Sequence, residues 1–235
     1  MNNAPALRLS EAGFTQATLP SRLGDYPDWH QGRERYGVWL MEIDSPALLA
    51  YITDVRQALA DLLHPQYQRQ PHITLFVCGF EQPEKRLSDD FTAQALRVQC
   101  DSLQRLAPSS FELQASHLDS FASAAFIALE DPQASLAPLR QALSQGSEEI
   151  RYASYVPHLT LGLYRQSIDA QALRQRLAAL PAPPSAPLRI TRLLYCTYCA
   201  QEQFGPLSER YRMELADAVA PPPRTRQEPV KTPHQ

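Results

Sequence analysis

The sequence predicts an α+β fold with antiparallel sheets, built from two related halves. Strand-like and helix-like segments alternate, yet several neighbouring strands follow one another with no helix between them, which favours antiparallel pairing. A strand–helix–strand unit that ends at Pro71-His-Ile-Thr-Leu75 has a counterpart that ends at Pro157-His-Leu-Thr-Leu161. This repetition indicates that the second half copies the architecture of the first.

The first half is predicted to begin with a strand at residues 36–43, an aromatic and aliphatic run. Ser45 then supplies a helix cap, and Pro46 suits the first helical turn. Apolar residues recur at helical spacing as far as His64-Pro65, which ends the helix. The remaining elements of this half are a strand at 71–79 and a helix that begins at 88–90.

The second half repeats this alternation and then closes with two strands. Asp131-Pro132 is expected to open its first helix, and the proline-rich residues 181–187 are expected to form a linker. The predicted strands are 111–115, 124–129, 157–164, 188–199 and 209–215, and the predicted helices are 131–145 and 169–180.

Composition excludes several classes of protein. A formal net charge of −3 over 235 residues argues against the broad basic face that duplex DNA or RNA binding usually needs. The first residues lack the basic and apolar regions of a secretory signal, and no apolar run approaches the roughly 20 residues that span a bilayer. Four cysteines in a chain of this length do not suggest a disulfide scaffold. We therefore expect a cytoplasmic protein without membrane contacts.

Cys196-Thr-Tyr-Cys199 has the C-x-x-C spacing of some metal and redox sites, but we interpret it as a pair of structural thiols. A zinc site needs a second ligand pair, and Cys78 and Cys100 are too far apart to form one locally. A redox motif would open a helix, whereas these residues have the composition of a strand. No metal and no cofactor are therefore expected.

The two Pro-His-x-Thr-Leu segments contain the residues best suited to catalysis. Because side chains alternate along a strand, His72 and Thr74 share one face, as do His158 and Thr160, while aliphatic residues occupy the other. Two such strands side by side would provide two imidazoles and two hydroxyls. One neutral histidine can accept a proton from water, the other can protonate a leaving oxygen, and hydroxyls can bind phosphate oxygens. The alternative is that both histidines are buried structural residues.

These segments resemble those of the two-histidine phosphoesterases, which include the RNA 2′,3′-cyclic phosphodiesterases, also called 2′-5′ RNA ligases. The resemblance spans about residues 36–215 and includes a closing Gly-Pro hairpin segment at 204–215. It implies a bilobed, pseudo-twofold fold with a central cleft, in which His72 and His158 are catalytic and Thr74 and Thr160 bind phosphate. Val156 departs from the basic residue that often precedes the second Pro-His in the cyclic phosphodiesterases.

The resemblance divides the chain into three parts. Residues 36–216 are expected to form the two-lobed phosphoesterase domain. Residues 1–35, which have no counterpart in the family, are expected to form an extension or a lid. Residues 217–235 are proline-rich and polar and are expected to be a disordered tail.

The predicted function is metal-independent hydrolysis of nucleoside 2′,3′-cyclic phosphates or 2′-5′ phosphodiesters, with RNA ligation as the reverse reaction. The partner would be an RNA end or a small nucleotide, and the protein is expected to be a monomer. Two alternatives stay open: a nucleotide sensor without turnover, and the same chemistry on a cyclic oligonucleotide or an ADP-ribose cyclic phosphate.

Other residues near the two segments are candidates for substrate binding. Arginines can hold a flanking phosphate, although they can equally be solvated surface residues. Aromatic residues can stack a base, although on strands they are more often simply packed. These candidates are Arg69, Arg151, Arg165, Phe76, Tyr155 and Tyr164.

Overall fold

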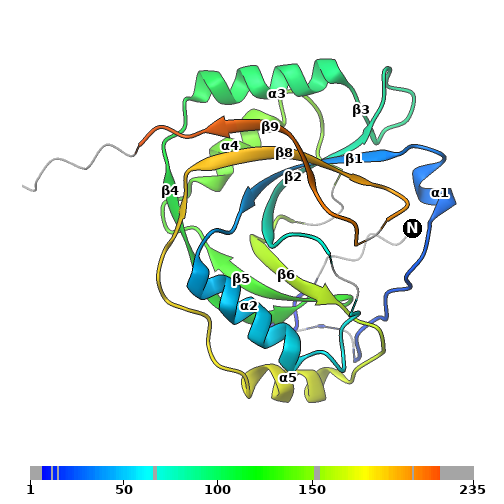
Figure 1. Ribbon diagram of the computed structural model, residues 1–235, viewed down its shortest axis with the longest axis vertical. Coiled ribbons are helices and arrows are strands. Elements are labelled where there is room, and N and C mark those ends of the chain that lie inside the picture. The colour runs from blue at the N-terminus through cyan, green and yellow to red at the C-terminus, as the bar shows by residue number, and fades with distance from the viewer. Residues whose placement is uncertain are drawn as a thin grey trace, which may run out of the picture.

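The computed structural model describes residues 7–11, 13–14, 16–65, 68–150, 154–202 and 204–217. The described part of the chain contains nine strands and five helices, arranged as in Figure 1. In chain order the elements are α1 (Pro27–His30), β1 (Arg35–Glu42), α2 (Pro46–Ala58), β2 (His72–Glu81), β3 (Asp90–Phe91), α3 (Ala93–Leu106), β4 (Phe111–Ser120), β5 (Ala124–Glu130), α4 (Leu136–Leu143), β6 (His158–Leu163), α5 (Ala170–Ala178), β7 (Leu188–Ile190), β8 (Arg192–Cys199) and β9 (Ser208–Glu214).

The strands form one curled sheet in the order β7-β4-β5-β6-β2-β1-β8-β9, and every neighbouring pair on this path is antiparallel. The short strand β3 pairs in parallel with β2. The sheet consists of two four-stranded lobes, which we call the β2 lobe (β2, β1, β8, β9) and the β6 lobe (β6, β5, β4, β7). They join through one register pair, Ile73 with Leu159. The α+β prediction is therefore confirmed, with the two sheets connected at this pair.

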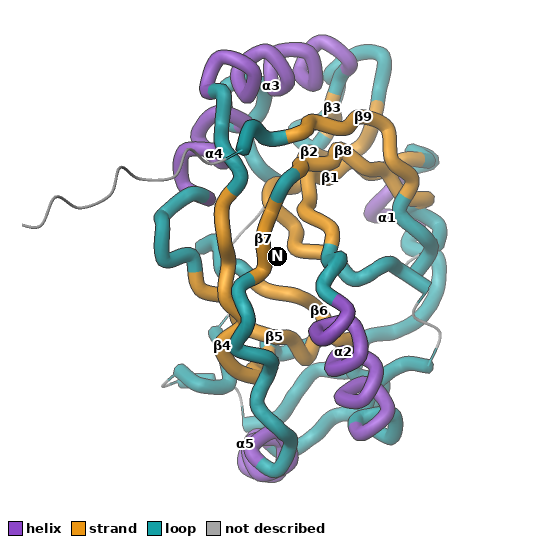
Figure 2. Tube along the Cα trace, turned by 60° about the vertical axis from the view of Figure 1, so that its left-hand side comes forward, coloured by secondary structure: helices purple, strands orange, loops and turns teal. Residues whose placement is uncertain are grey.

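The two halves of the chain exchange helices between the lobes. Helix α2 connects β1 to β2 but contacts β6, and helix α4 connects β5 to β6 but contacts β2. Figures 1 and 2 show α3 and α4 beside the β2 lobe and α2 and α5 beside the β6 lobe. The repeated strand–helix–strand unit thus packs as an interlocked pair, which ties both lobes into one hydrophobic core.

Local chemistry explains where the helices begin, and it corrects two predicted boundaries. The Ser45 side chain caps α2, as expected. Residues 88–90 do not start a helix, because the Asp90 carboxylate accepts backbone bonds from Arg86 and Leu87 and forms a tight turn into β3. Helix α3 begins only after Thr92, whose hydroxyl caps it. Helix α4 likewise starts at Leu136, later than expected.

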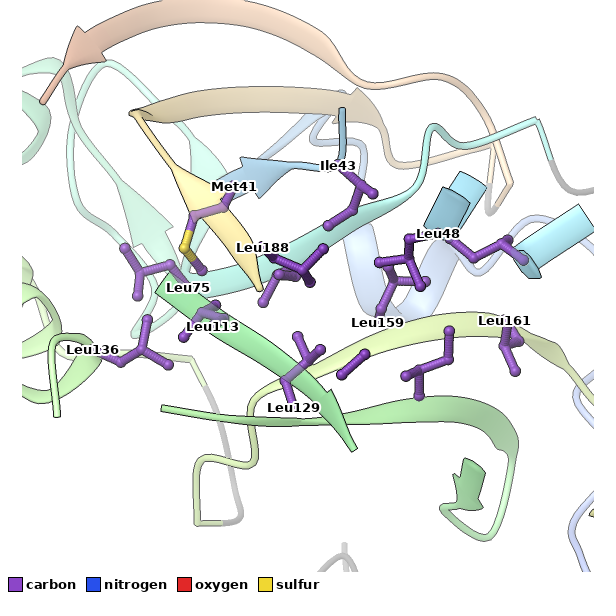
Figure 3. Packing of buried hydrophobic residues seen from close by; sticks show 14 of the residues in the cluster. Met41, Ile43, Leu48, Leu75, Leu113, Leu129, Leu136, Leu159, Leu161 and Leu188 are labelled. Atoms are coloured by element: carbon purple, nitrogen blue, oxygen red, sulfur yellow. The ribbon is translucent and has the colours of Figure 1, made fainter. Parts of the chain in front are cut away.

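The core occupies the side of β2 and β6 opposite the two histidines. Ile73, Leu75, Leu159 and Leu161 are all 1% exposed or less, as the period-2 pattern predicts. Figure 3 shows Leu75 and Leu159 pointing into the same packed interior, from different lobes. Burial of large aliphatic side chains of this kind is worth roughly 1.5–3 kcal/mol each. The core therefore fixes the position in which the two strands meet.

The N-terminal segment packs against both lobes where it is described. Thr18 N–H donates to Ile168 O and Ser21 N–H donates to Tyr164 O, each at 2.8 Å, on the β6 lobe. Arg33 forms ion pairs with Asp89 at 2.6 Å and Asp90 at 2.8 Å on the β2 lobe. Its function as a lid stays a prediction.

Two further expectations concern the whole chain. The predicted tail at 217–235 lies, apart from Asp217, outside the described residues. Across the described part of the chain, the helices are all too short or too polar to cross a membrane.

Candidate functional site

The structure brings the two histidine segments together at the junction of the lobes. Because β2 and β6 are antiparallel and pair Ile73 with Leu159, continuing this register places His72 across from Thr160 and Thr74 across from His158. All four polar side chains are partly exposed, whereas the two paired aliphatic residues are fully buried. The site therefore presents two imidazoles and two hydroxyls on one face, each imidazole beside the hydroxyl of the other segment.

Both imidazoles are held by the same backbone contact. Nδ1 of His72 lies 2.7 Å from Gln70 O, and Nδ1 of His158 lies 2.7 Å from Val156 O. A carbonyl oxygen can only accept, so each Nδ1 carries a proton and donates it. In the neutral ring this leaves the lone pair on Nε2, available for proton transfer. The repeated Pro-His segment thus fixes the same tautomer twice.

Positive charges lie around the His72 ring. The pKa of His72 is lowered from its ordinary 6.5 to about 4, chiefly because burial desolvates the ring. The positive charges of Arg69, then of His158 and Arg56, contribute to this lowering, and only the hydrogen bond to Gln70 opposes it. Near neutral pH, His72 is consequently in its neutral form.

His158 lies against two aromatic rings. The Phe121 ring, in the turn between β4 and β5, meets the His158 ring edge-on with centroids 5.0 Å apart. Phe126 contacts the same ring at 5.3 Å and stacks on Phe121 at 4.3 Å. Phe126 is fully buried, whereas Phe121 keeps part of its surface exposed. The aromatic pair therefore restricts the orientation of His158 and leaves one ring accessible beside it.

Tyr155 and Arg69 are the substrate-binding candidates that lie near the paired segments. The Tyr155 hydroxyl donates to Thr74 O at 3.1 Å, and the Arg140 guanidinium stacks on its ring at 3.8 Å. Tyr155 therefore anchors the backbone of the first segment. The Arg69 guanidinium stacks on the Tyr198 ring at 4.0 Å, and its charge acts on His72. Arg69 is thus placed to add positive charge beside the histidines.

The structure corrects three other expectations. Phe76 is 2% exposed and Tyr164 is fully buried, with its hydroxyl bonded to Ser120, so neither ring can stack a base. Arg165 follows the far end of β6 from His158 and donates to Asp61 O. Because a strand rises about 3.3 Å per residue, a residue just past the end of β6 lies far from His158 at its start. Arg151 lies outside the described residues.

Three residues near the site gave no signal in the sequence. Arg56 lies on α2 and donates to Leu161 O at 2.8 Å; Phe121 and Gln70 lie in connections. The fold brings each of these residues close to the histidines, and none of them belongs to a sequence motif. Periodicity of a helix or strand carries no information about such contacts.

The described residues contain no group of three or more His, Cys, Asp or Glu side chains that could hold a metal ion. Cys196 and Cys199 lie at the end of strand β8, one buried and one exposed, as their predicted strand implies.

Two interlocked strand–helix–strand units, each ending in a strand that begins with a His-x-Thr segment, thus meet at the centre of the sheet. Residues 44–197, more than half of the chain, match the family model of the 2′-5′ RNA ligase superfamily. The chain belongs to this family. No curated relative matches the chain.

Solved structures with the same fold include two of E. coli LigT. LigT complexed with phosphate has a TM-score of 0.54 at 15% identity, over 79% of this chain and 100% of that chain. LigT complexed with 3′-AMP has a TM-score of 0.52 at 16% identity, over 78% and 99%. A conserved protein of unknown function from Agrobacterium tumefaciens has a TM-score of 0.51 at 13% identity, over 76% and 85%. At these identities the likeness is one of fold.

Proposed function

We propose that the 36–216 domain is a metal-independent phosphodiesterase that hydrolyses nucleoside 2′,3′-cyclic phosphates or 2′-5′ phosphodiesters. The pairing of Ile73 with Leu159 is the observation that carries this proposal, because it joins two identical His-x-Thr units at one junction. Membership of the superfamily supports it. So do the ligands in two LigT structures, 3′-AMP and NADP+, because a related fold that binds nucleotides supports a small nucleotide as the substrate. An RNA end, which presents the same groups, is included in the proposal.

The proposed reaction uses one histidine for each proton transfer. The neutral Nε2 of one ring takes a proton from the attacking water, whose oxygen bonds to phosphorus. The protonated Nε2 of the other ring gives a proton to the ribose oxygen as the P–O bond breaks. The hydroxyls of Thr74 and Thr160 donate hydrogen bonds to the non-bridging oxygens while charge develops on them. With the 5′-hydroxyl of a second RNA end in place of water, the same two proton transfers would form a 2′-5′ phosphodiester from a 2′,3′-cyclic phosphate and release the 3′-hydroxyl.

The environments of the two rings favour one assignment of their roles. The low pKa of His72 keeps this ring neutral, which is the state that a general base requires. His158 then serves as the general acid. Arg69, whose charge already acts on His72, supplies a cation for the phosphate. This assignment also explains how two similar segments come to perform different steps.

The test is a panel of substrates assayed in excess EDTA: nucleoside 2′,3′-cyclic phosphates, 2′-5′ dinucleotides, an ADP-ribose cyclic phosphate and a cyclic dinucleotide. Turnover of the first or second group is expected, and His72→Ala or His158→Ala should reduce it by about 10²–10⁴-fold. His117→Ala is the matched control, because this histidine is exposed and bonded to Ser116 on β4.

Each other outcome has a definite meaning. Binding without turnover across the panel would identify a nucleotide sensor instead of an enzyme. Turnover of only the ADP-ribose or cyclic dinucleotide compounds would retain the chemistry and change the substrate. Loss of activity in EDTA, restored by added metal, would contradict the mechanism.

A further inference from the structure

The loop between β8 and β9 contacts the segment that leads into His72. The loop is described at residues 200–202 and 204–207, and the segment at residues 68–71. Gln68 N–H donates to Phe204 O at 3.2 Å, and Arg69 Nε donates to Gly205 O at 3.3 Å. Two segments more than a hundred residues apart in the chain therefore lie against each other immediately before the first histidine.

Gln70 makes the most specific of these contacts. Its side-chain Nε2 donates to Leu207 O at 3.1 Å, and its Oε1 accepts from Leu207 N–H at 2.9 Å. The amide thus binds both polar groups of one backbone residue, as a neighbouring strand would. Among the side chains, the amides of Asn and Gln offer an N–H donor and a carbonyl acceptor side by side in this geometry.

Gln70 also contacts His72 directly. Its backbone carbonyl, 2.7 Å from His72 Nδ1, is the acceptor that fixes the tautomer of this ring. The same residue therefore joins the loop through its side chain and the histidine through its main chain. Any rotation of the Gln70 backbone moves the acceptor of His72, and the side-chain amide opposes that rotation.

The loop between β8 and β9 is compact where it contacts the segment that leads into His72. A Cβ atom on Gly205 would lie 2.9 Å from Glu202 Cβ and 3.2 Å from Glu202 O, too close for another residue without a shift. Leu207 also packs against the cluster that contains Leu40 and Leu194. The carbonyl and amide that Gln70 binds are thus held by a compact turn on one side and by an apolar contact on the other.

We propose that Gln70 is a positioning residue, which uses the β8–β9 loop to hold His72 in its Nδ1–H tautomer with Nε2 toward the substrate. This inference rests on the proposed function only for its kinetic effect. His158 has the same kind of backbone acceptor, Val156 O, but lies on the other lobe, where aromatic rings support it. Different contacts therefore hold the two histidines, and Gln70 holds His72.

The test compares Gln70→Ala with Gln68→Ala. Gln68 is a glutamine of the same segment that contacts the loop through its backbone amide, which alanine retains. The ¹⁵N shifts of the histidine rings report tautomers directly and require no substrate. In Gln70→Ala, the His72 ring is expected to become a mixture of tautomers, while the His158 ring is unchanged. In Gln68→Ala, both rings should match the wild type.

Kinetics provide the second readout. Misplacing a proton-transfer group should lower kcat by about fivefold to tenfold and leave KM within about twofold. Gln70→Glu should act in the same direction, because a carboxylate accepts from Leu207 N–H but cannot donate to Leu207 O. It also replaces Gln70→Ala should that variant not fold.

The inference is overturned when the folded Gln70 variants leave the His72 ring in the wild-type tautomer. It is equally overturned by a matching change at His158, which would indicate a general loss of structure. If no substrate is turned over, the proposed function fails but the ring shifts still decide the role of Gln70.

Discussion

Arg56 and Arg140 occupy equivalent positions on either side of the junction between the lobes. Arg56 donates to Leu161 O at 2.8 Å, and Arg140 donates to Leu75 O at 2.5 Å. Each carbonyl lies two residues beyond the strand pair that joins the lobes, where β2 and β6 diverge. The arginine of each exchanged helix thus bonds to a carbonyl that the neighbouring strand no longer reaches. The pseudo-twofold relation extends from the backbone to these side chains.

The equivalent arginines should both stabilise the fold. Arg56→Met and Arg140→Met each leave a strand carbonyl without this donor, which should lower the free energy of unfolding by about 1–3 kcal/mol. Arg140→Met should cost more, because Arg140 is also paired with Glu149 at 2.5 Å, and this largely buried carboxylate, which also accepts from Val77 N–H, would lose its ion pair. Urea unfolding of both variants measures this difference. Equal stability to the wild type would mean that the two contacts are incidental.

Arg69 should affect both catalysis and the titration of His72. Arg69→Met removes a positive charge that lowers the pKa of His72, so this pKa should rise and the acid limb of kcat/KM should move to higher pH. Activity should fall by about 10-fold, through loss of the proposed phosphate contact. Arg165→Met is the matched control, since Arg165 is exposed at the far end of β6. A shift of the same size in both variants would rule out a local effect.

The low pKa of His72 predicts how stability depends on pH. The ring titrates at about 4 in the folded protein and near its ordinary 6.5 when unfolded, so the unfolded chain binds more protons between these values. Stability contributed by this ring is therefore complete above pH 6.5 and declines as the pH falls toward 4. The loss should be about 1–3 kcal/mol, since water partly screens a ring with exposed surface. His72→Gln should flatten this part of the curve; an unchanged slope would place the low pKa in doubt.

Phe121 should matter for kcat more than for folding. Phe121→Leu keeps apolar contact with the buried Phe126 but removes the ring that meets His158 edge-on. We expect kcat to fall by about threefold to tenfold, because His158 gains freedom to rotate. A melting curve beside the kinetics separates this effect from unfolding. If Phe121 also contacts the substrate, KM rises in the same variant; unchanged kinetics would exclude both roles.

The central part of the site could be predicted because its information is local. Strand alternation places His72 and Thr74 on one face and Ile73 on the other, and the second segment repeats the pattern. The structure confirms this burial pattern and adds the pairing of Ile73 with Leu159, which no single segment specifies. The repeated segment indicated that the two strands belong together, but it did not specify the register in which they pair.

The errors in the prediction have a common physical origin. Tyr164 and Arg165 follow the second segment closely in sequence, yet an extended strand carries them away from its start and into the core or the opposite end. Residues 88–90 do not start a helix because the Asp90 carboxylate accepts from the backbone of a turn and forms an ion pair with Arg33. Side-chain bonds to distant backbone, such as that of Gln70 to Leu207, depend on the complete fold.

A crystal structure with a bound nucleoside 2′-monophosphate tests most directly whether two histidines serve one phosphorus atom. We expect the phosphate to lie between the segments, with Nε2 of His72 and of His158 each within about 3 Å of a phosphate oxygen and both threonine hydroxyls in hydrogen-bond contact. A phosphate bound by one histidine alone, or at another place on the protein, would contradict catalysis by the pair.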